Sequence, residues 1–295
     1  MFADLLTPKT LKTLEAFKLQ SRRKFLGFRQ GGHISLRRGH GIEFSDYRNY
    51  ELGDDPRHID WGVYARSDKL YVKRFQEEQD LNVYLLLDNS PSLFFPEQEK
   101  KWQRLISLAL AIAYVALMQG DTVYFVVLGE QQPLACRSVS ELNRIAELLK
   151  KSKAHQVSDW SERMQKAAYS LRFPGVAYLL SDLMFESEEV SSLIMSLLSR
   201  NLETNVIRIG ATSDLDPFLG RTSFFEARDS ESGALHQINF DAAAQKSYFE
   251  LIKQHQQQIL RFMHSKGVAY AVFQATQSLV DFITTDLKPL GVMQC

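Results

Sequence analysis

Residues 83–92 read VYLLLDNSPS, an apolar and aromatic run that stops abruptly at oxygen-bearing side chains. A short continuous run of this kind predicts a buried strand of a parallel sheet. Asp88, Ser90 and Ser92 follow at alternating positions, so their oxygens can converge beyond the end of the strand. Two interpretations are open. Such side chains commonly cap a following helix, and they can also supply part of the octahedral oxygen shell that Mg²⁺ requires.

A second short apolar run, residues 177–182 (AYLLSD), also ends at an aspartate. If both runs are strands of one parallel sheet, Asp88 and Asp182 lie at the same edge, where open α/β sheets bind their ligands. Ser158 stands just before a helical stretch and could reach this edge from a third loop. The second run therefore favours a metal site over a helix cap.

Strands and helices are predicted to alternate along the chain, which is typical of a mostly parallel sheet flanked by helices. The predicted strands are residues 70–75, 83–87, 122–128, 177–182, 205–209 and 267–273. The predicted helices are residues 5–25, 105–118, 140–150, 162–171, 190–200 and 240–265. We expect residues 1–80 to form an N-terminal extension and residues 81–295 to form one α/β domain.

Composition indicates an ordinary globular protein. The formal net charge is zero and the pI is about 7.1, so no global field attracts the chain to nucleic acid or to an anionic membrane. The two cysteines, Cys136 and Cys295, make no disulfide framework and suit a reducing compartment. The most apolar stretch, residues 105–118, is shorter than the roughly 20 residues that a bilayer requires. We therefore expect no membrane span, no signal peptide and a cytoplasmic location.

Residues 38–61 read RGHGIEFSDYRNYELGDDPRHIDW and alternate in charge. This pattern favours a charge-paired structural collar packed on the α/β domain, with aromatic bulk from Tyr47, Tyr50 and Trp61. The expected members of the network are Arg38, Glu43, Arg48, Asp54, Asp55, Arg57, Asp60 and Trp61.

Two other functions are open at this point. A metal-dependent hydrolase could use Asp88, Asp182 and the Asp54–Asp60 cluster, although no H-E-x-x-H or comparable catalytic spacing is present. Residues 22–38 contain six basic residues and no acidic one, which could bind nucleic acid. Acidic residues follow immediately, so pairing within the protein is favoured, and we expect no nucleic-acid partner.

The pattern Asp88-x-Ser90-x-Ser92 resembles the metal-ion-dependent adhesion site of von Willebrand factor A domains. There, a threonine and an aspartate from two further loops complete the site, which places Ser158 in the position of the threonine and Asp182 in that of the aspartate. Residues 38–61 resemble the bacterial family called domain of unknown function 58, whose members join such a segment to an A-like domain. The turn typical of that family is only approximated at residues 226–239 (EARDSESGALHQIN).

The resemblance implies a von Willebrand factor A-like (Rossmann-type) fold that binds Mg²⁺ or another divalent cation. It also implies a non-catalytic protein-interaction module whose partner is an AAA+ ATPase of the MoxR type, a class thought to assist assembly or activation of other complexes. The chain has no phosphate-binding loop, so ATP hydrolysis would come from that partner. Many relatives carry N-terminal membrane spans, and their absence here favours a cytoplasmic member.

Overall fold

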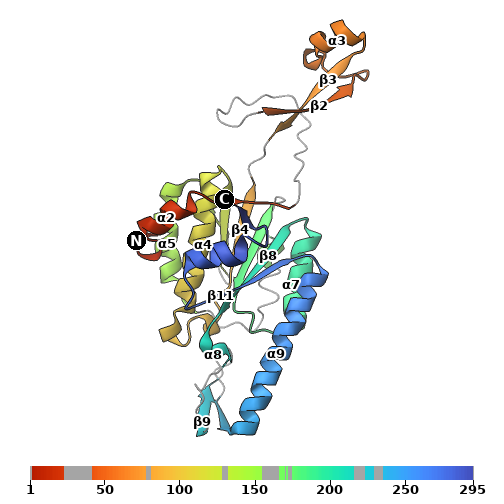
Figure 1. Ribbon diagram of the computed structural model, residues 1–295. Helices are drawn as coiled ribbons and strands as arrows, with labels where there is room; N and C mark the ends of the chain where they lie inside the picture. The colour runs from red at the N-terminus through yellow and green to blue at the C-terminus, as the bar shows by residue number, and fades with distance from the viewer. Residues whose placement is uncertain are drawn as a thin grey trace. The chain divides into compact units, whose positions relative to one another are not determined.

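The computed structural model divides the chain into two compact units (Figure 1). It describes residues 2–22, 42–77, 81–127, 132–154, 166–169, 171, 175–215, 223–228 and 235–294. Met1–Lys24 and Leu81–Cys295 together form what we call the sheet unit, and Phe25–Asp80 forms the inserted unit. This division differs from the expected one, which placed residues 1–80 together. The reason is burial, because Leu6, Leu14 and Leu19 are at most 7% exposed.

The core of the sheet unit is a six-stranded sheet in the order β11-β8-β7-β4-β5-β6. Its strands are β4 (Asn82–Leu87), β5 (Thr122–Val127), β6 (Leu134–Cys136), β7 (Val176–Ser181), β8 (Glu203–Gly210) and β11 (Ala269–Gln274). All neighbouring pairs are parallel except β5 and β6. The predicted α/β class with a mostly parallel sheet is therefore confirmed.

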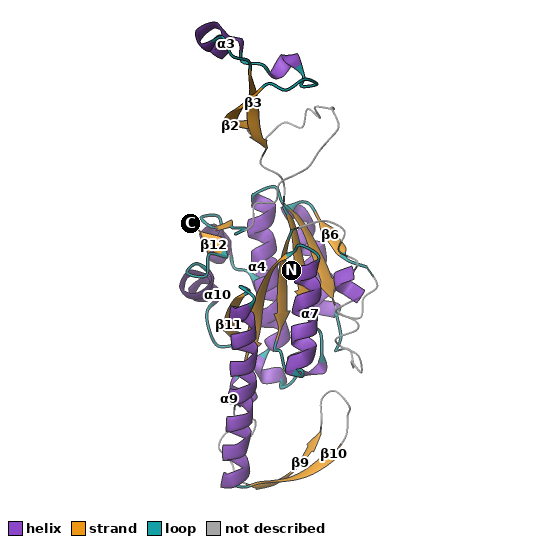
Figure 2. Ribbon diagram, turned by 90° about the vertical axis from the view of Figure 1, so that its right-hand side faces the viewer, coloured by secondary structure: helices purple, strands orange, loops and turns teal. Residues whose placement is uncertain are grey.

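Helices cover both faces of this sheet (Figure 2). They are α4 (Lys101–Met118), α5 (Leu142–Lys151), α7 (Ser187–Ser199) and α9 (Ala242–Ser265). Successive residues of a strand point to opposite faces, so the buried residues 83–87 of β4 can pack against helices on both sides. Leu86 belongs to a buried cluster with Leu193 of α7 and Met263 of α9. These four helices were predicted to within a few residues. Half of the predicted helix at residues 162–171 lies outside the described residues, and residues 166–169 are helical.

The helical stretch Glu97–Met118 is long and apolar enough to cross a membrane by length and composition, and 83% of its apolar window is buried inside the protein. Leu105, Leu108 and Ile112 of α4 are each 0% exposed. A helix that is apolar on all sides is expected in such a core position.

The predicted helix at residues 5–25 is wrong. The segment instead contains α1 (Phe2–Leu5), α2 (Pro8–Leu14) and the short strand β1 (Lys18–Leu19). Proline disfavours helical geometry in the residue before it but is well placed in a first turn, so α2 begins at Pro8. The Oγ of Thr7 caps it by accepting from the backbone amide of Thr10 at 3.2 Å. β1 pairs antiparallel with β12 (Met293–Gln294), a partner that no local pattern could indicate.

Two further antiparallel pairs of strands belong to the described fold, and three of their four strands were not predicted. In the inserted unit, β2 (Ile42–Asn49) pairs antiparallel with β3 (Tyr71–Glu77), and α3 (Trp61–Ser67) lies between them in sequence. In the sheet unit, β9 (Ser223–Arg228) pairs with β10 (Leu235–Phe240) directly before α9. Of these strands, β3 was predicted.

Candidate functional site

Asp88 and Asp182 lie at the carboxyl ends of adjacent parallel strands. Leu87 of β4 is paired with Leu180 of β7, and the amide of Asp88 donates to the carbonyl of Leu180 at 3.0 Å. From β4 the chain continues to β5 on one side, whereas from β7 it continues to β8 on the other. Such a reversal of strand order opens the crevice in which α/β sheets bind ligands. The prediction that both aspartates share one sheet edge is confirmed.

The Asp88 carboxylate is fully buried among hydroxyl and amide donors. Its Oδ1 accepts from the backbone amide of Ser90 at 2.9 Å, and its Oδ2 accepts from the Ser181 hydroxyl at 2.6 Å. The hydroxyls of Ser90 and Ser92 lie 3.0 Å apart. Ser90 precedes the short turn Pro91–Leu93 but makes no side-chain cap to it. These side chains therefore gather oxygens at one point instead of capping a helix.

The pKa of Asp88 is raised to about 7, chiefly by burial and then by the neighbouring charge of Asp182. Hydrogen bonds from Ser181 and Ser90 oppose this rise because they stabilise the ionised carboxylate. Asp88 therefore gains or loses its proton near neutral pH. A nearby positive charge would favour the ionised form.

Asp182 is paired with a buried lysine that the sequence did not indicate. Lys101, the first residue of α4, is 3% exposed at its side chain, and its Nζ lies 3.2 Å from Oδ2 of Asp182. The same Nζ donates to Oδ1 of Asp214 at 2.9 Å. Asp214 belongs to the short helix α8 (Thr212–Leu215), which follows β8. Burial alone would lower the pKa of Lys101, but Asp182 and Asp214 raise it overall, so the ammonium stays charged.

A second cation, Arg208 of β8, completes this buried cluster. Its Nε donates to the backbone carbonyl of Asp182 at 3.2 Å, and its Nη2 lies 3.7 Å from Oδ2 of Asp214. The same Oδ2 accepts from the amide of Ala211 at 2.9 Å. Burial raises the pKa of Asp214, and Lys101 opposes that rise. Two carboxylates and two cations therefore neutralise each other beside Asp88.

Sequence reasoning missed Lys101, Ser181, Arg208 and Asp214. Two of them carried a usable signal. Ser181 directly precedes Asp182, and Asp214 follows a predicted strand just as Asp88 does. Ser158 lies outside the described residues. Within the part of the chain that the structure describes, no three His, Cys, Asp or Glu side chains are grouped in a way that could hold a metal ion. Cation binding at this edge would therefore depend on the serine hydroxyls.

Two ion pairs of the expected charge network are present in the inserted unit. Arg48 makes two hydrogen bonds to Asp54, at 2.9 and 2.8 Å. Arg57 pairs with Asp55, another expected member, at 2.6 Å. Arg38 lies outside the described residues, and Glu43 lies on β2.

Asp60 and Trp61 have other roles than the expected ones. Oδ1 of Asp60 caps α3 by accepting from the amides of Gly62 and Val63, and Oδ2 accepts from the Tyr47 hydroxyl at 2.9 Å. Trp61, expected to supply packing bulk, is 60% exposed and meets Tyr64 edge-on at 6.0 Å between ring centroids. Asp60 is thus a local structural residue.

Replacing Asp60 with alanine is expected to lower the unfolding free energy by about 0.5–2 kcal/mol, the usual cost of losing an N-cap. Arg57→Ala is the matched control, because the Arg57 side chain is 85% exposed and its loss should leave stability unchanged. Urea denaturation followed by circular dichroism compares the two variants. Equal midpoints for Asp60→Ala and wild type would contradict the capping role.

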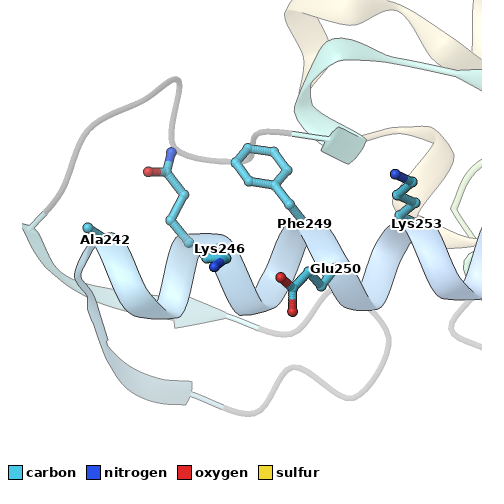
Figure 3. A pocket seen from close by; sticks show the side chains of 6 residues that line it. Ala242, Lys246, Phe249, Glu250 and Lys253 are labelled. Atoms are coloured by element: carbon cyan, nitrogen blue, oxygen red, sulfur yellow. The ribbon is translucent and has the colours of Figure 1, made fainter.

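A shallow depression of about 290 Å³ lies along the N-terminal half of α9 (Figure 3). Its lining residues are Ala242, Gln245, Lys246, Phe249, Glu250 and Lys253. All of them come from one helix, and their charges are mixed. The depression therefore lacks the convergence of polar groups seen at the carboxyl edge of the sheet.

The fold and the buried edge define an α/β protein with a polar cluster at its topological switch point. The chain belongs to the family described as protein of unknown function DUF58, whose sequence profile matches residues 46–258. Uncharacterized proteins of Mycobacterium bovis and Mycobacterium tuberculosis are 35% identical to it over 92 residues, which is 31% of this chain. The match spans 29% of the length of those relatives.

Two solved structures are similar over a larger part of the chain. The conserved hypothetical protein BatB from Bacteroides thetaiotaomicron aligns with a TM-score of 0.44 at 14% identity. An aerotolerance-related membrane protein from Bacteroides fragilis, carrying multiple mutations to serine, aligns with a TM-score of 0.41 at 15% identity. Each alignment covers 71% of this chain and 98% of the other.

Proposed function

We propose that the sheet unit is a von Willebrand factor A-like interaction module that docks a partner protein through a divalent cation at the carboxyl edge. The observation that carries this proposal is the convergence of Asp88, Ser90 and Ser92 beside Asp182 at the switch point of the sheet. The module is non-catalytic in this proposal, and its role is recognition.

The residues present fit a hard cation. Asp88, Ser90 and Ser92 supply one carboxylate and two hydroxyls, the oxygen donors that Mg²⁺ and Mn²⁺ accept. Ser92 is the partly exposed member, so a ligand from outside would approach on its side. With Ser158 and Asp182 as further proposed members, the set still contains few full charges. We therefore expect affinity in the millimolar range, since Mg²⁺ also dehydrates reluctantly.

The charge balance of the edge supports an acidic partner. Lys101 and Arg208 already neutralise Asp182 and Asp214, so the ionised form of Asp88 gives the cluster a surplus negative charge. A bound divalent cation would turn that surplus into a net positive charge. A carboxylate from the partner would then complete both the coordination and the charge of the site.

The partner class comes from the family resemblance and not from the geometry. We propose a MoxR-type AAA+ ATPase in the cytoplasm, with ATP hydrolysis on the partner and client recognition shared between the two proteins. The hydrolase alternative has less support, because Asp54 and Asp55 are each hydrogen-bonded to an arginine of the inserted unit.

Affinity purification of the full chain from its native host tests this proposal. We expect an AAA+ ATPase to be captured in Mg²⁺ and to be lost, by about tenfold or more, in EDTA and in Asp88→Ala. Asp281→Ala is the control, because it removes an exposed carboxylate on α10 (Leu279–Phe282) that is not a member of the proposed cation site. Capture that survives both EDTA and Asp88→Ala would place docking elsewhere and overturn the proposal.

A further inference from the structure

Lys101 is a cation already present inside the proposed cation site. Its Nζ contacts Asp182 at 3.2 Å and Asp214 at 2.9 Å, and its side chain is 3% exposed. The other Asp182 oxygen has only a long contact, 3.4 Å from the amide of Met184. Lys101 is therefore the principal partner of the Asp182 carboxylate among the described residues.

The two aspartates of the edge are consequently unequal. Asp88 is surrounded by the Ser181 hydroxyl and the Ser90 amide, donors that a cation could replace or share. Asp182 instead faces an ammonium group in a buried environment, where the interaction is strong. Direct contact between Asp182 and a divalent cation would require Lys101 to lose its ion pair with Asp182. The positive charges of Lys101 and the cation would also repel each other.

We infer that Lys101 is a resident counter-ion that keeps the Asp182 carboxylate from direct contact with a divalent cation and so makes the affinity of the site weak. This inference rests on the cation site of the proposed function and adds the residue that regulates it. Asp88, Ser90 and Ser92 contact the cation. Asp182 does not contact it and affects its binding only through its negative charge and by holding Lys101 in place. Removing Lys101 without changing the net charge should therefore tighten cation binding through Asp182.

Two double variants of the full chain separate this role from net charge. Lys101→Met with Asp214→Asn removes one charge of each sign and leaves Asp182 without its ammonium partner. Lys101→Met with Asp182→Asn has the same net charge but leaves Asp214 as the remaining acid. Neutral replacement of both members of a buried ion pair is generally compatible with folding. Circular dichroism checks the fold of each variant before binding is measured.

The electron paramagnetic resonance signal of free Mn²⁺ reports the dissociation constant directly. We expect the variant that retains Asp182 to bind Mn²⁺ about tenfold more tightly than wild type, because it gains a carboxylate ligand. The variant that retains Asp214 should bind about as wild type does. Equal affinities in the two double variants, or no gain over wild type in the first, would overturn the inference.

The measurement of Mn²⁺ affinity and the measurement of partner capture test the two proposals separately. A tenfold gain in Mn²⁺ affinity, with partner capture that ignores Mg²⁺, would support the role of Lys101 and reject docking through the cation. Cation-dependent capture with equal Mn²⁺ affinities in the two double variants would retain docking and reject the role of Lys101. Absence of Mn²⁺ binding from wild type and both variants would reject both.

Discussion

Replacing Lys101 with methionine alone is expected to lower the unfolding free energy by about 3–5 kcal/mol in metal-free buffer. The reason is that Asp182 and Asp214 would remain as buried carboxylates without their shared ammonium. Thermal and urea denaturation of wild type and variant in EDTA measures the loss. Lys150→Met is the control, because Lys150 pairs at the surface with Asp4 at 3.4 Å and with Glu147 at 4.0 Å, and loss of such exposed pairs should leave the melting temperature unchanged.

The loss in Lys101→Met should depend on pH. Burial already raises the pKa of Asp214, and without the ammonium this pKa rises further, because Lys101 no longer opposes the effect of burial. The contribution of Asp214 to stability is then greatest at low pH and is lost as pH rises through its folded-state pKa. The variant should therefore be closer to wild type at pH 5 than at pH 8. A penalty that is small and independent of pH would show that Lys101 is not an essential counter-charge.

Replacing Asp88 with asparagine is expected to stabilise the metal-free protein at pH 8 while removing its response to cations. Because the folded-state pKa of Asp88 is about 7, well above the ordinary aspartate value of 3.8, the folded state favours the protonated form more than the unfolded chain does. In wild type, the contribution of protonated Asp88 to the stability of the folded state is therefore fully present below about pH 4 and is lost as pH rises through 7. Asparagine is neutral at all these pH values. The expected gain at pH 8 is on the order of 1–3 kcal/mol.

Divalent cations should reduce this difference in stability. At a cation concentration ten times the dissociation constant, wild type should gain about 1.4 kcal/mol and Asp88→Asn nothing. Melting curves at pH 6 and pH 8, with EDTA or with Mg²⁺, measure both effects, and Asp281→Asn serves as the carboxylate control. If Mg²⁺ raises the melting temperature of Asp88→Asn as much as that of wild type, the cation does not bind at Asp88.

The position of the edge was predictable because it follows from strand order and polarity. The apolar runs before Asp88 and Asp182 each indicate a buried strand, and adjacent parallel strands must end together. The chemistry at that edge was less predictable. Lys101 lies at the start of a helix among other charged residues, and nothing local indicates that its side chain turns inward to Asp182. Pairings of this kind depend on packing between distant segments.

Dependence on packing between distant segments also explains the errors in the predicted fold. Residues 5–25 have a helical pattern, yet Lys18 and Leu19 are drawn into a strand by Gln294 and Met293. Trp61 was expected to pack because of its size, but as the first residue of α3 it is 60% exposed. Local propensity is a weak prior, and tertiary context decides such cases.

The pairing of β1 with β12 also affects how the protein is made on the ribosome. Leu19 is synthesised long before its partner Met293, and all of the inserted unit lies between them in the sequence. Contacts between such distant residues form late, because the chain must first close a very long loop. β1 can therefore complete its strand pairing only once residues 293–294 have been made, and truncation before them should leave Leu19 without Met293.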